Sequence, residues 1–183
     1  MDPTPTWSPG DVVTASQMNT CIRDNPAFLL GGQQIVQKRW RNSGNYTTSA
    51  TAWTKVDSVN LTLSVISTFA SGRLFCTTQF WTSIIELDGG VTAPYFVFYD
   101  LLIDNTTYLS TGTSSSGFGC ATLSRDAAYT PTATTFMNFS GCFTGLSADV
   151  HTVDLVWKCG NANTRGTIFG NASVPVSLMI AEF

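Results

Sequence analysis

The chain has 183 residues, which is long enough for one well-filled domain preceded by a short segment. Charged residues make up only 11% and the formal net charge is -3, so no basic surface is left for general nucleic-acid binding. Hydrophobic residues make up 43%, yet no apolar run approaches the roughly 18 to 20 residues that a membrane helix needs. Residues 1–5 have neither the basic start nor the apolar core of a secretory signal, which predicts assembly in a cytoplasm. We therefore expect a soluble protein without a nucleic-acid partner and without membrane insertion.

Residues 7–30 carry the only helix signals of the chain. Thr14 followed three residues later by Gln17 forms a capping box, which predicts a short helix that begins at Ala15. Apolar residues then recur at roughly helical spacing and give one apolar stripe. Pro26 predicts a break or a kink, because proline cannot donate to the helix ladder. An isolated helix of this length is marginal in water, so the stripe must dock either on its own domain or on another protein.

From residue 33 onward the apolar pattern changes from a period of about 3.6 to a period of 2, which is typical of strands with one dry and one wet face. In one such stretch, Val59 shares the dry face with Leu61, Leu63 and Val65. About eight short strands separated by Gly, Asn and Asp turns predict an all-β sandwich, and this number of strands fits a two-sheet jelly roll. The expected strands are 35–40, 59–65, 74–85, 95–103, 136–143, 151–158, 167–169 and 174–180.

Some of these stretches carry a further expectation. Residues 74–85 form either one long strand or a bent pair. Residues 95–103 are apolar on both faces, which predicts a place in the middle of the sandwich or at a subunit interface, and Asp104-Asn105 ends the stretch as a turn. Residues 106–135 are rich in Ser, Thr, Gly and Ala and form either a long surface loop or two weak edge strands. Pro175 indicates an edge strand or a strand start.

The search for catalytic patterns is mostly negative. His151 is the only histidine, it lies at the entry of an alternating strand, and no Gly-x-Ser-x-Gly motif accompanies it. We expect it to bond to a turn or to line a trimer interface. Glu86, Asp88, Asp100 and Asp104 supply carboxylates for a glycosidase pair or for calcium, but acidic residues at strand ends are usually turn formers and the spacing matches no known calcium loop. The sequence therefore predicts that the protein is not an enzyme and has no cofactor and no metal site.

Five cysteines are scattered along the chain with no Cys-x-x-Cys pair: Cys21, Cys76, Cys120, Cys142 and Cys159. An odd, scattered set with a single histidine disfavours a zinc site. In a reducing cytoplasm we expect small buried apolar side chains, although Cys120, Cys142 and Cys159 could oxidise once a particle is released.

A motif within residues 7–25 adds a family resemblance. The order Trp-x-x-Gly-Asp-x-Val-Thr-Ala-Ser-x-Met-Asn at 7–19, followed by Ile-Arg-Asp-Asn at 22–25, resembles an N-terminal segment common in structural proteins of tailed bacteriophages, such as tail-fibre, appendage and minor virion proteins. Pro26 departs from that pattern, in which a non-proline residue usually continues the helix. The resemblance implies that residues 1–32 are an attachment arm with a short helix, whose anchoring side chains are Trp7, Val13, Met18, Ile22, Phe28 and Leu29.

The strand region carries a second resemblance. Residues 146–157, the last residues 178–183 and the stretch 99–105 are similar to strands of phage jelly-roll domains shaped like the C1q and tumour-necrosis-factor folds. The resemblance implies that residues 33–183 form a jelly-roll β-sandwich that assembles as a homotrimer. The apolar strand surface, which exceeds what one small sandwich can cover on both sides, also predicts self-association.

Together these features predict a non-enzymatic virion structural protein of a tailed phage, fixed to the particle by its arm through major capsid or tail proteins. A chain this short, without a coiled-coil or collagen-like shaft, favours a capsid decoration protein, a cement protein or a short head appendage over a complete tail fibre. The alternative is a tail-tip or tail-fibre receptor-binding module, in which the 106–135 region and the aromatic residues Tyr108, Phe118 and Tyr129 hold a host surface glycan. Both alternatives need the same fold and arm, so the sequence leaves the location in the virion open.

Overall fold

The computed structural model describes residues 35–40, 45–66, 72–87, 95–110, 117–123, 132–170 and 175–182. These residues form strands, and no helix among them is long and apolar enough to cross a membrane. The predicted N-terminal helix and Tyr129 lie outside the described residues, as do the predicted attachment residues Trp7, Val13, Met18, Ile22, Phe28 and Leu29. The strands are β1 (Ile35–Trp40), β2 (Tyr46–Thr48), β3 (Thr54–Lys55), β4 (Thr62–Ile66), β5 (Leu74–Glu86), β6 (Tyr95–Ile103), β7 (Thr107–Tyr108), β8 (Gly119–Leu123), β9 (Thr132–Phe143), β10 (Val150–Cys159), β11 (Thr164–Phe169) and β12 (Val176–Glu182).

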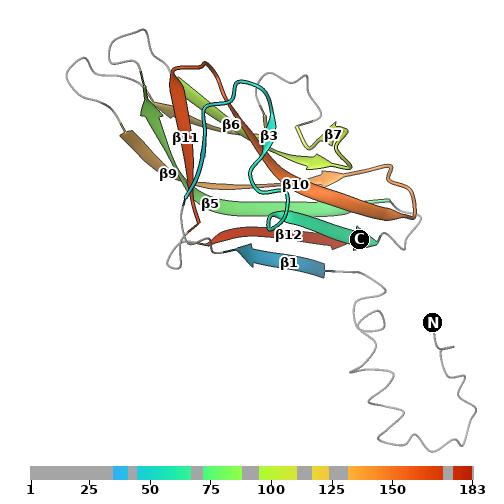
Figure 1. Cartoon of the computed structure of the whole chain (residues 1–183). Coiled ribbons are helices and arrows are strands. Elements are labelled where there is room, and N and C mark those ends of the chain that lie inside the picture. Colours follow the sequence, from blue (N-terminus) through green and yellow to red (C-terminus); the bar gives the residue numbers. More distant parts are fainter. Residues whose placement is uncertain are drawn as a thin grey trace, which may run out of the picture.

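The first sheet is built around the long strand β5 (Figure 1). β9 pairs antiparallel with one side of β5 along residues 74–85. The other side of β5 is shared, because β12 pairs with residues 74–79 and β11 pairs with residues 81–86. β1 extends the sheet beyond β12, and β2 extends it beyond β11. The stretch predicted as one long strand or a bent pair is therefore one long strand.

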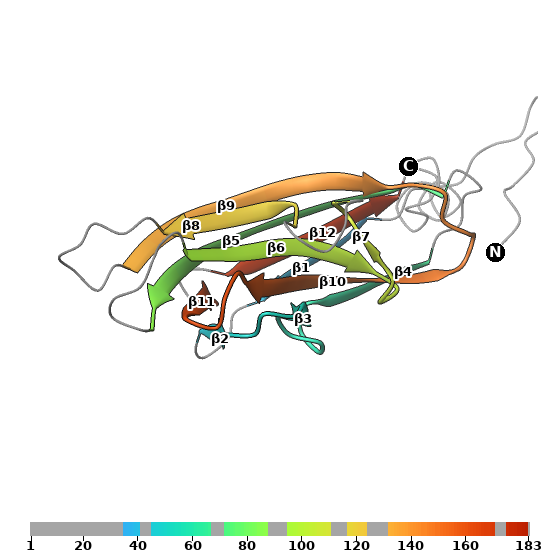
Figure 2. The ribbon, with the colours of Figure 1, turned by 90° about the horizontal axis from the view of Figure 1, so that it is seen from above.

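The second sheet is built around the antiparallel pair of β10 and β6. β4 and β3 pair with the other side of β10, and β7 and β8 pair with the other side of β6. The two sheets form an all-β sandwich, whose long strands run along an elongated body (Figure 2). Contacts between β8 and β9, and between β1 and β4, link the sheets at their margins.

The core lies between the sheets and is filled by side chains from alternate strand positions. Phe80 of β5 is fully buried, and its ring meets the ring of Tyr99 on β6 edge to face, with centroids 4.9 Å apart. Full burial of a large apolar side chain contributes on the order of 1.5 to 3 kcal/mol. The buried face predicted for β10 is confirmed, since His151, Val153, Leu155 and Trp157 are all buried. The opposite face is not uniformly wet, because Asp154 and Val156 are buried as well.

Several sequence expectations for turns and edges can be compared with the fold. β6 lies in the middle of its sheet, which is one of the two places that its apolar faces predict. Asp104 and Asn105 have φ values of 51° and 58° and form the predicted turn after β6. Within residues 106–135, the described parts contain the short strands β7 and β8 at the sheet margin and the start of β9. Pro175 directly precedes β12, which lies between β1 and β5, so this proline marks a strand start and not an edge.

Val59 corrects the predicted strand at residues 59–65. Its side chain is 76% exposed, whereas Leu61, Leu63 and Val65 are buried as predicted. The reason is local, because the Asp57 carboxylate accepts hydrogen bonds from the backbone amide of Val59 at 2.9 Å and from the next amide at 2.8 Å. These bonds fold a turn that competes with the strand. β4 consequently begins only at residue 62.

Candidate functional site

His151 is held by two connecting segments, which agrees with the turn-bonding role that its position predicts. Its Nδ1 lies 2.7 Å from Asp104 Oδ2, and its Nε2 lies 2.9 Å from the carbonyl oxygen of Ser147. Both ring nitrogens are thereby engaged by a carboxylate and a carbonyl. The arrangement lacks the contact between nucleophile and base that covalent catalysis of the serine or cysteine type uses.

Asp100, Asp104 and Asp154 each have hydrogen-bond or ion-pair partners of their own. Asp100 is fully buried and accepts hydrogen bonds from two backbone amides through Oδ1, and its burial raises the pKa of this carboxyl above the usual value. Asp104 is the partner of His151. Asp154, which the sequence did not single out, is buried on β10 and lies 2.8 Å from the Lys55 ammonium. Within the described ranges, no three His, Cys, Asp or Glu side chains are grouped so as to hold a metal ion.

The four cysteines of the described residues are free thiols. Cys76 and Cys159 are buried as predicted, and burial raises the pKa of both thiols. Cys120 and Cys142 are exposed, which corrects the expectation that the cysteines act as small buried side chains. Both point outward because side chains alternate along a strand, Cys142 from β9 in the first sheet and Cys120 from β8 in the second.

The outer face of the first sheet has an unusual composition. Odd-numbered residues of β5 point outward, and their register partners on β9 and β12 point outward with them. The described outward side chains of these three strands include no charged residue. Arg165 of β11, the register partner of Ile85, is an exposed charged side chain at the border of this surface. We call this surface the β5 outer face, and it comprises Phe75, Thr77, Gln79, Trp81, Ser83, Ile85, Thr134, Phe136, Asn138, Ser140, Cys142, Ser177, Met179 and Ala181.

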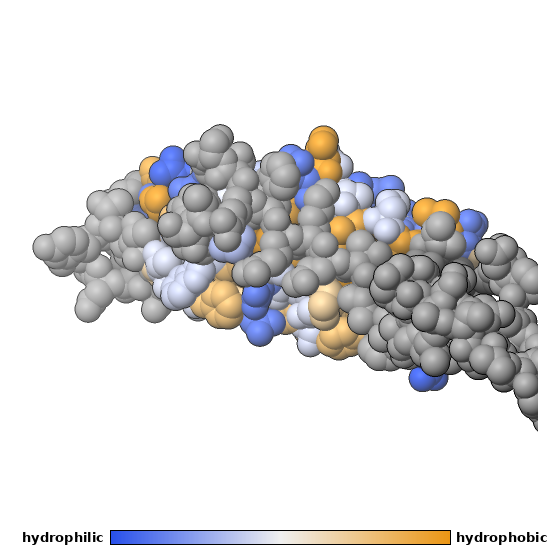
Figure 3. Space-filling view, turned by 90° about the horizontal axis from the view of Figure 1, so that it is seen from below, coloured by the Kyte–Doolittle hydropathy of each residue, from blue (hydrophilic) through white to orange (hydrophobic). Residues whose placement is uncertain are grey.

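Two aromatic side chains form the most exposed apolar part of the β5 outer face. Trp81 is 43% exposed and Phe136 is 46% exposed, and they are register partners on β5 and β9. Their ring centroids lie 5.5 Å apart. In the view of Figure 3, hydrophobic patches of the described surface are separated by hydrophilic ones. Trp81 and Phe136 are in ring contact, so their exposed parts form one small joint apolar surface.

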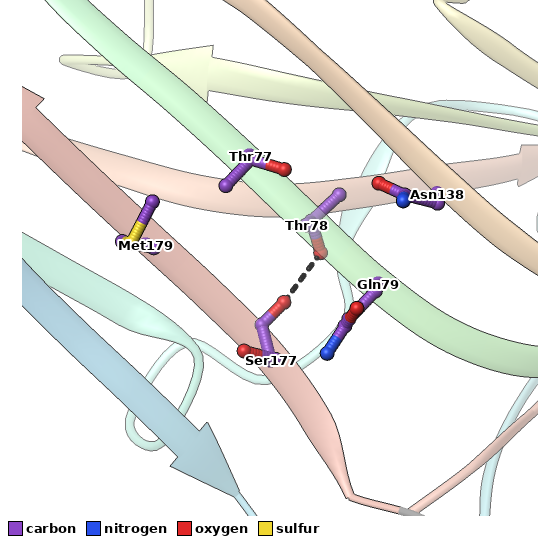
Figure 4. A pocket seen from close by; sticks show the side chains of 6 residues that line it. All are labelled: Thr77, Thr78, Gln79, Asn138, Ser177 and Met179. Carbon is purple, nitrogen blue, oxygen red and sulfur yellow. Dashed lines mark hydrogen bonds between the residues drawn. The ribbon is translucent and has the colours of Figure 1, made fainter.

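A shallow hollow of about 180 Å³ lies on the same face (Figure 4). Gln79, Asn138 and Ser177 are register partners on three adjacent strands, so two amides and a hydroxyl stand in one row. Thr78 Oγ1 donates a hydrogen bond of 2.9 Å to the carbonyl oxygen of Ser177. The hollow therefore combines uncharged hydrogen-bonding groups with one thioether, and its lining residues are Thr77, Thr78, Gln79, Asn138, Ser177 and Met179.

The predicted glycan-contacting residues of the described part lie near Trp53, which the sequence did not single out. Tyr108 on β7 packs against Trp53, with ring centroids 5.4 Å apart. A Cβ placed on Gly117 would come within 2.8 Å of Trp53 Cη2, so the backbone just before Phe118 lies against the Trp53 ring. Phe118 is 46% exposed, but its ring contact is with Phe139, at 5.8 Å. Tyr108 and Phe118 therefore belong to different ring pairs and do not form one platform.

Comparisons with known proteins give no family assignment. No protein-family model matches the chain, and no curated protein matches its sequence. The β5 outer face is therefore the feature from which a function can be proposed.

Proposed function

We propose that the chain is a non-enzymatic structural protein of a tailed-phage virion, in which a jelly-roll domain forms homotrimers and the arm of residues 1–32 fixes them to the particle. The observation that carries the proposal is the uncharged β5 outer face with its exposed Trp81–Phe136 pair. The phage-like motif at residues 7–25 supports the virion location. The resemblance to trimeric jelly-roll domains supports an assembly of three copies.

The strand order supports the jelly-roll topology. Apart from β2, β3, β7 and β11, the strands form the order β1, β12, β5, β9 in one sheet and the order β4, β10, β6, β8 in the other. Among these eight strands, the chain crosses between the sheets at every connection except that from β6 to β8. A jelly roll has eight strands arranged as two Greek keys in two packed sheets, and this order fits that description.

The β5 outer face suits contact between copies of this chain. Aromatic side chains are enriched and charged side chains are depleted at the centres of protein interfaces. A second copy that covers Trp81 and Phe136 would remove apolar surface from water, which contributes about 25 cal/mol per Å². Gln79 and Asn138 could bond across such an interface without the cost of removing a charge from water. In a closed, symmetric trimer every copy makes the same contact with its neighbours.

Two exposed thiols on different sheets allow a direct test of this interface. Cys142 belongs to the β5 outer face, whereas Cys120 points outward from the second sheet. In the assembled protein we expect Cys142 to be protected from a maleimide while Cys120 is modified, as measured by peptide mass spectrometry. Equal modification of both thiols would contradict the proposed interface.

Within the virion, we propose a capsid decoration protein, a cement protein or a short head appendage. The support is that the described residues form one β-sandwich, which suits a protein that decorates a surface. Gold-labelled antibody on purified particles should mark the head. Labelling of the tail tip would reject this location, and complete absence from particles would reject the virion function.

A second candidate function is recognition of a host surface glycan, and the hollow on the β5 outer face favours it. Amides and hydroxyls bond to sugar hydroxyl groups, and an exposed aromatic ring can pack against the apolar face of a sugar. The hollow offers Gln79, Asn138 and Ser177 on the same face as Trp81. This function requires an open β5 outer face, so a protected Cys142 would exclude it. A glycan array probed with the intact protein, with Gln79→Ala as the variant, tests it directly.

A further inference from the structure

His151 is the only histidine of the chain, and both of its ring nitrogens face hydrogen-bond acceptors. Nδ1 lies 2.7 Å from Asp104 Oδ2, and Nε2 lies 2.9 Å from the Ser147 carbonyl oxygen. A carbonyl oxygen and an ionised carboxylate oxygen accept hydrogen bonds but cannot donate them. A neutral imidazole has a single N–H and satisfies one of these contacts, whereas an imidazolium satisfies both.

The surroundings place the shared proton on the imidazole. Asp104 Oδ1 accepts a hydrogen bond of 2.8 Å from the Thr152 backbone amide, while Oδ2 faces His151. Burial opposes ionisation of Asp104, but these hydrogen bonds keep the pKa of its carboxyl below the ordinary value. Burial would likewise lower the pKa of His151, but the bonds to the Ser147 carbonyl and the Asp104 carboxylate raise it above 6.5.

The His151 contacts join two connecting segments at one end of the sandwich. Asp104 belongs to the turn after β6, and Ser147 belongs to the 144–149 segment that connects β9 to β10. In the same segment, the Leu146 amide donates a hydrogen bond of 3.1 Å to the Gly72 carbonyl, just before β5. β1 begins and β12 ends at this same end, beside the start of β5. The 144–149 segment therefore lies at the end of the sandwich where β1 enters.

We propose that the His151 imidazolium is a pH-sensitive latch, which fastens the 144–149 segment to the turn after β6 and releases it when the imidazole loses its proton. The charged groups that act on it are Asp104 from the turn and Asp149 from the segment itself, and both favour the charged ring. The neighbour on β4 is the uncharged Val65. The latch does not depend on the proposed virion function, because all of its contacts lie within one chain.

The direction of the pH dependence follows from linkage. The folded pKa of His151 is raised above the ordinary value of 6.5. The latch therefore contributes its full stability below pH 6.5 and loses it as the pH rises through the folded pKa. The 144–149 segment should be fastened at pH 6.5 and released above the folded pKa of His151.

Nitrogen-resolved NMR of the imidazole tests the latch without ambiguity, since the chain has one histidine. At pH 6.5 we expect both ring nitrogens of the folded, full-length protein to be protonated, with a titration midpoint above that value. Above the midpoint, the Leu146 amide should exchange with solvent about tenfold faster than its intrinsic pH dependence explains, as expected for the loss of a hydrogen bond to a charged group. A neutral ring at pH 6.5, or a Leu146 exchange rate that follows the intrinsic dependence throughout, would overturn the latch.

Matched variants separate the latch from other effects of pH. Asp104→Asn removes the charge but keeps a side chain of the same shape, so the His151 midpoint should fall below that of the parent. Ser147→Ala is the control, because the latch uses the backbone carbonyl of Ser147 and not its side chain. The His151 midpoint in this variant should equal that of the parent. If Asp104→Asn does not fold, Asp149→Asn should still lower the midpoint by a smaller amount. An unchanged midpoint in the folded member of this pair would contradict the latch.

Discussion

Phe136→Arg tests the proposed contact between copies at its most exposed apolar side chain. Phe136 is 46% exposed in a single chain. An aromatic side chain can bury on the order of 150 to 250 Å², so about 70 to 115 Å² of Phe136 remains for a second copy to cover. At about 25 cal/mol per Å², this area contributes about 2 to 3 kcal/mol per chain. We therefore expect the variant to dissociate about 30- to 150-fold more readily for each contact, and more where the arginine charge is left without a partner.

Phe118→Arg is the matched control for this variant. Phe118 is the same residue type and equally exposed at 46%, but it precedes β8 in the second sheet. Light scattering over a dilution series should show Phe136→Arg moving toward the 19.7 kDa monomer while Phe118→Arg keeps the parent mass. Both variants should remain folded, since both change surface side chains. Equal dissociation of the two variants, or none in either, would refute the assignment of the interface to the β5 outer face.

Three further predictions concern the fold and the arm. Gly72→Ala should destabilise the protein by more than about 2 kcal/mol, because φ is +52° and a Cβ would lie 2.1 Å from the Leu146 carbonyl oxygen. Gly145→Ala has open space around its Cβ and should cost only about 1 to 2 kcal/mol. Urea unfolding compares the two, and equal losses would contradict the steric explanation. Burial opposes ionisation of Asp57, but hydrogen bonds lower its pKa from 3.8 to about 2, so its stabilisation is present above pH 3.8 and lost as the pH falls toward about 2. Thermal unfolding of Asp57→Ala should therefore lack this part of the acid dependence, and an acid profile identical to that of the parent would argue against it. Removal of residues 1–31 should leave a folded oligomer that no longer joins particles, and a fall of many degrees in melting temperature would instead show that the arm belongs to the core.

Alternation of apolar residues was sufficient to predict most of the strands, because burial of one sheet face imposes a period of 2 on the sequence. Leu61, Leu63 and Val65 are a clear example, since they are buried while Thr62 and Ser64 between them are not. The same pattern misplaced Val59, where the Asp57 side chain folds the backbone into a turn. A hydrogen bond from one side chain to a nearby amide leaves no trace in apolar periodicity. Such local turns therefore need the structure.

The candidate site could be predicted only in part. The even spacing of Phe75, Thr77, Gln79 and Trp81 places them on one face of a strand, and this follows from the sequence alone. Phe136 lies beside Trp81 because of the register between β5 and β9. Alternation indicates which face a residue occupies but not which residue of the next strand lies beside it. The absence of charge from the β5 outer face becomes visible only once three strands are aligned.

Long-range polar contacts were also beyond the sequence. Lys55 and Asp154 form an ion pair of 2.8 Å although β3 and β10 are far apart in the chain. Trp53 likewise comes from a segment without apolar period and reaches Tyr108 on β7. Contacts of this kind depend on which strands become neighbours, and one sequence contains no direct signal for that choice.

The mass of the purified full-length chain in solution tests the proposed self-assembly most directly. Three chains of 19.7 kDa give a trimer of about 59 kDa. We expect light scattering at micromolar concentration to show a single species of about 59 kDa, held by contacts that do not depend on ion pairs and that high salt does not weaken. A single species of 19.7 kDa under the same conditions would contradict the proposed trimer and leave the β5 outer face open to solvent.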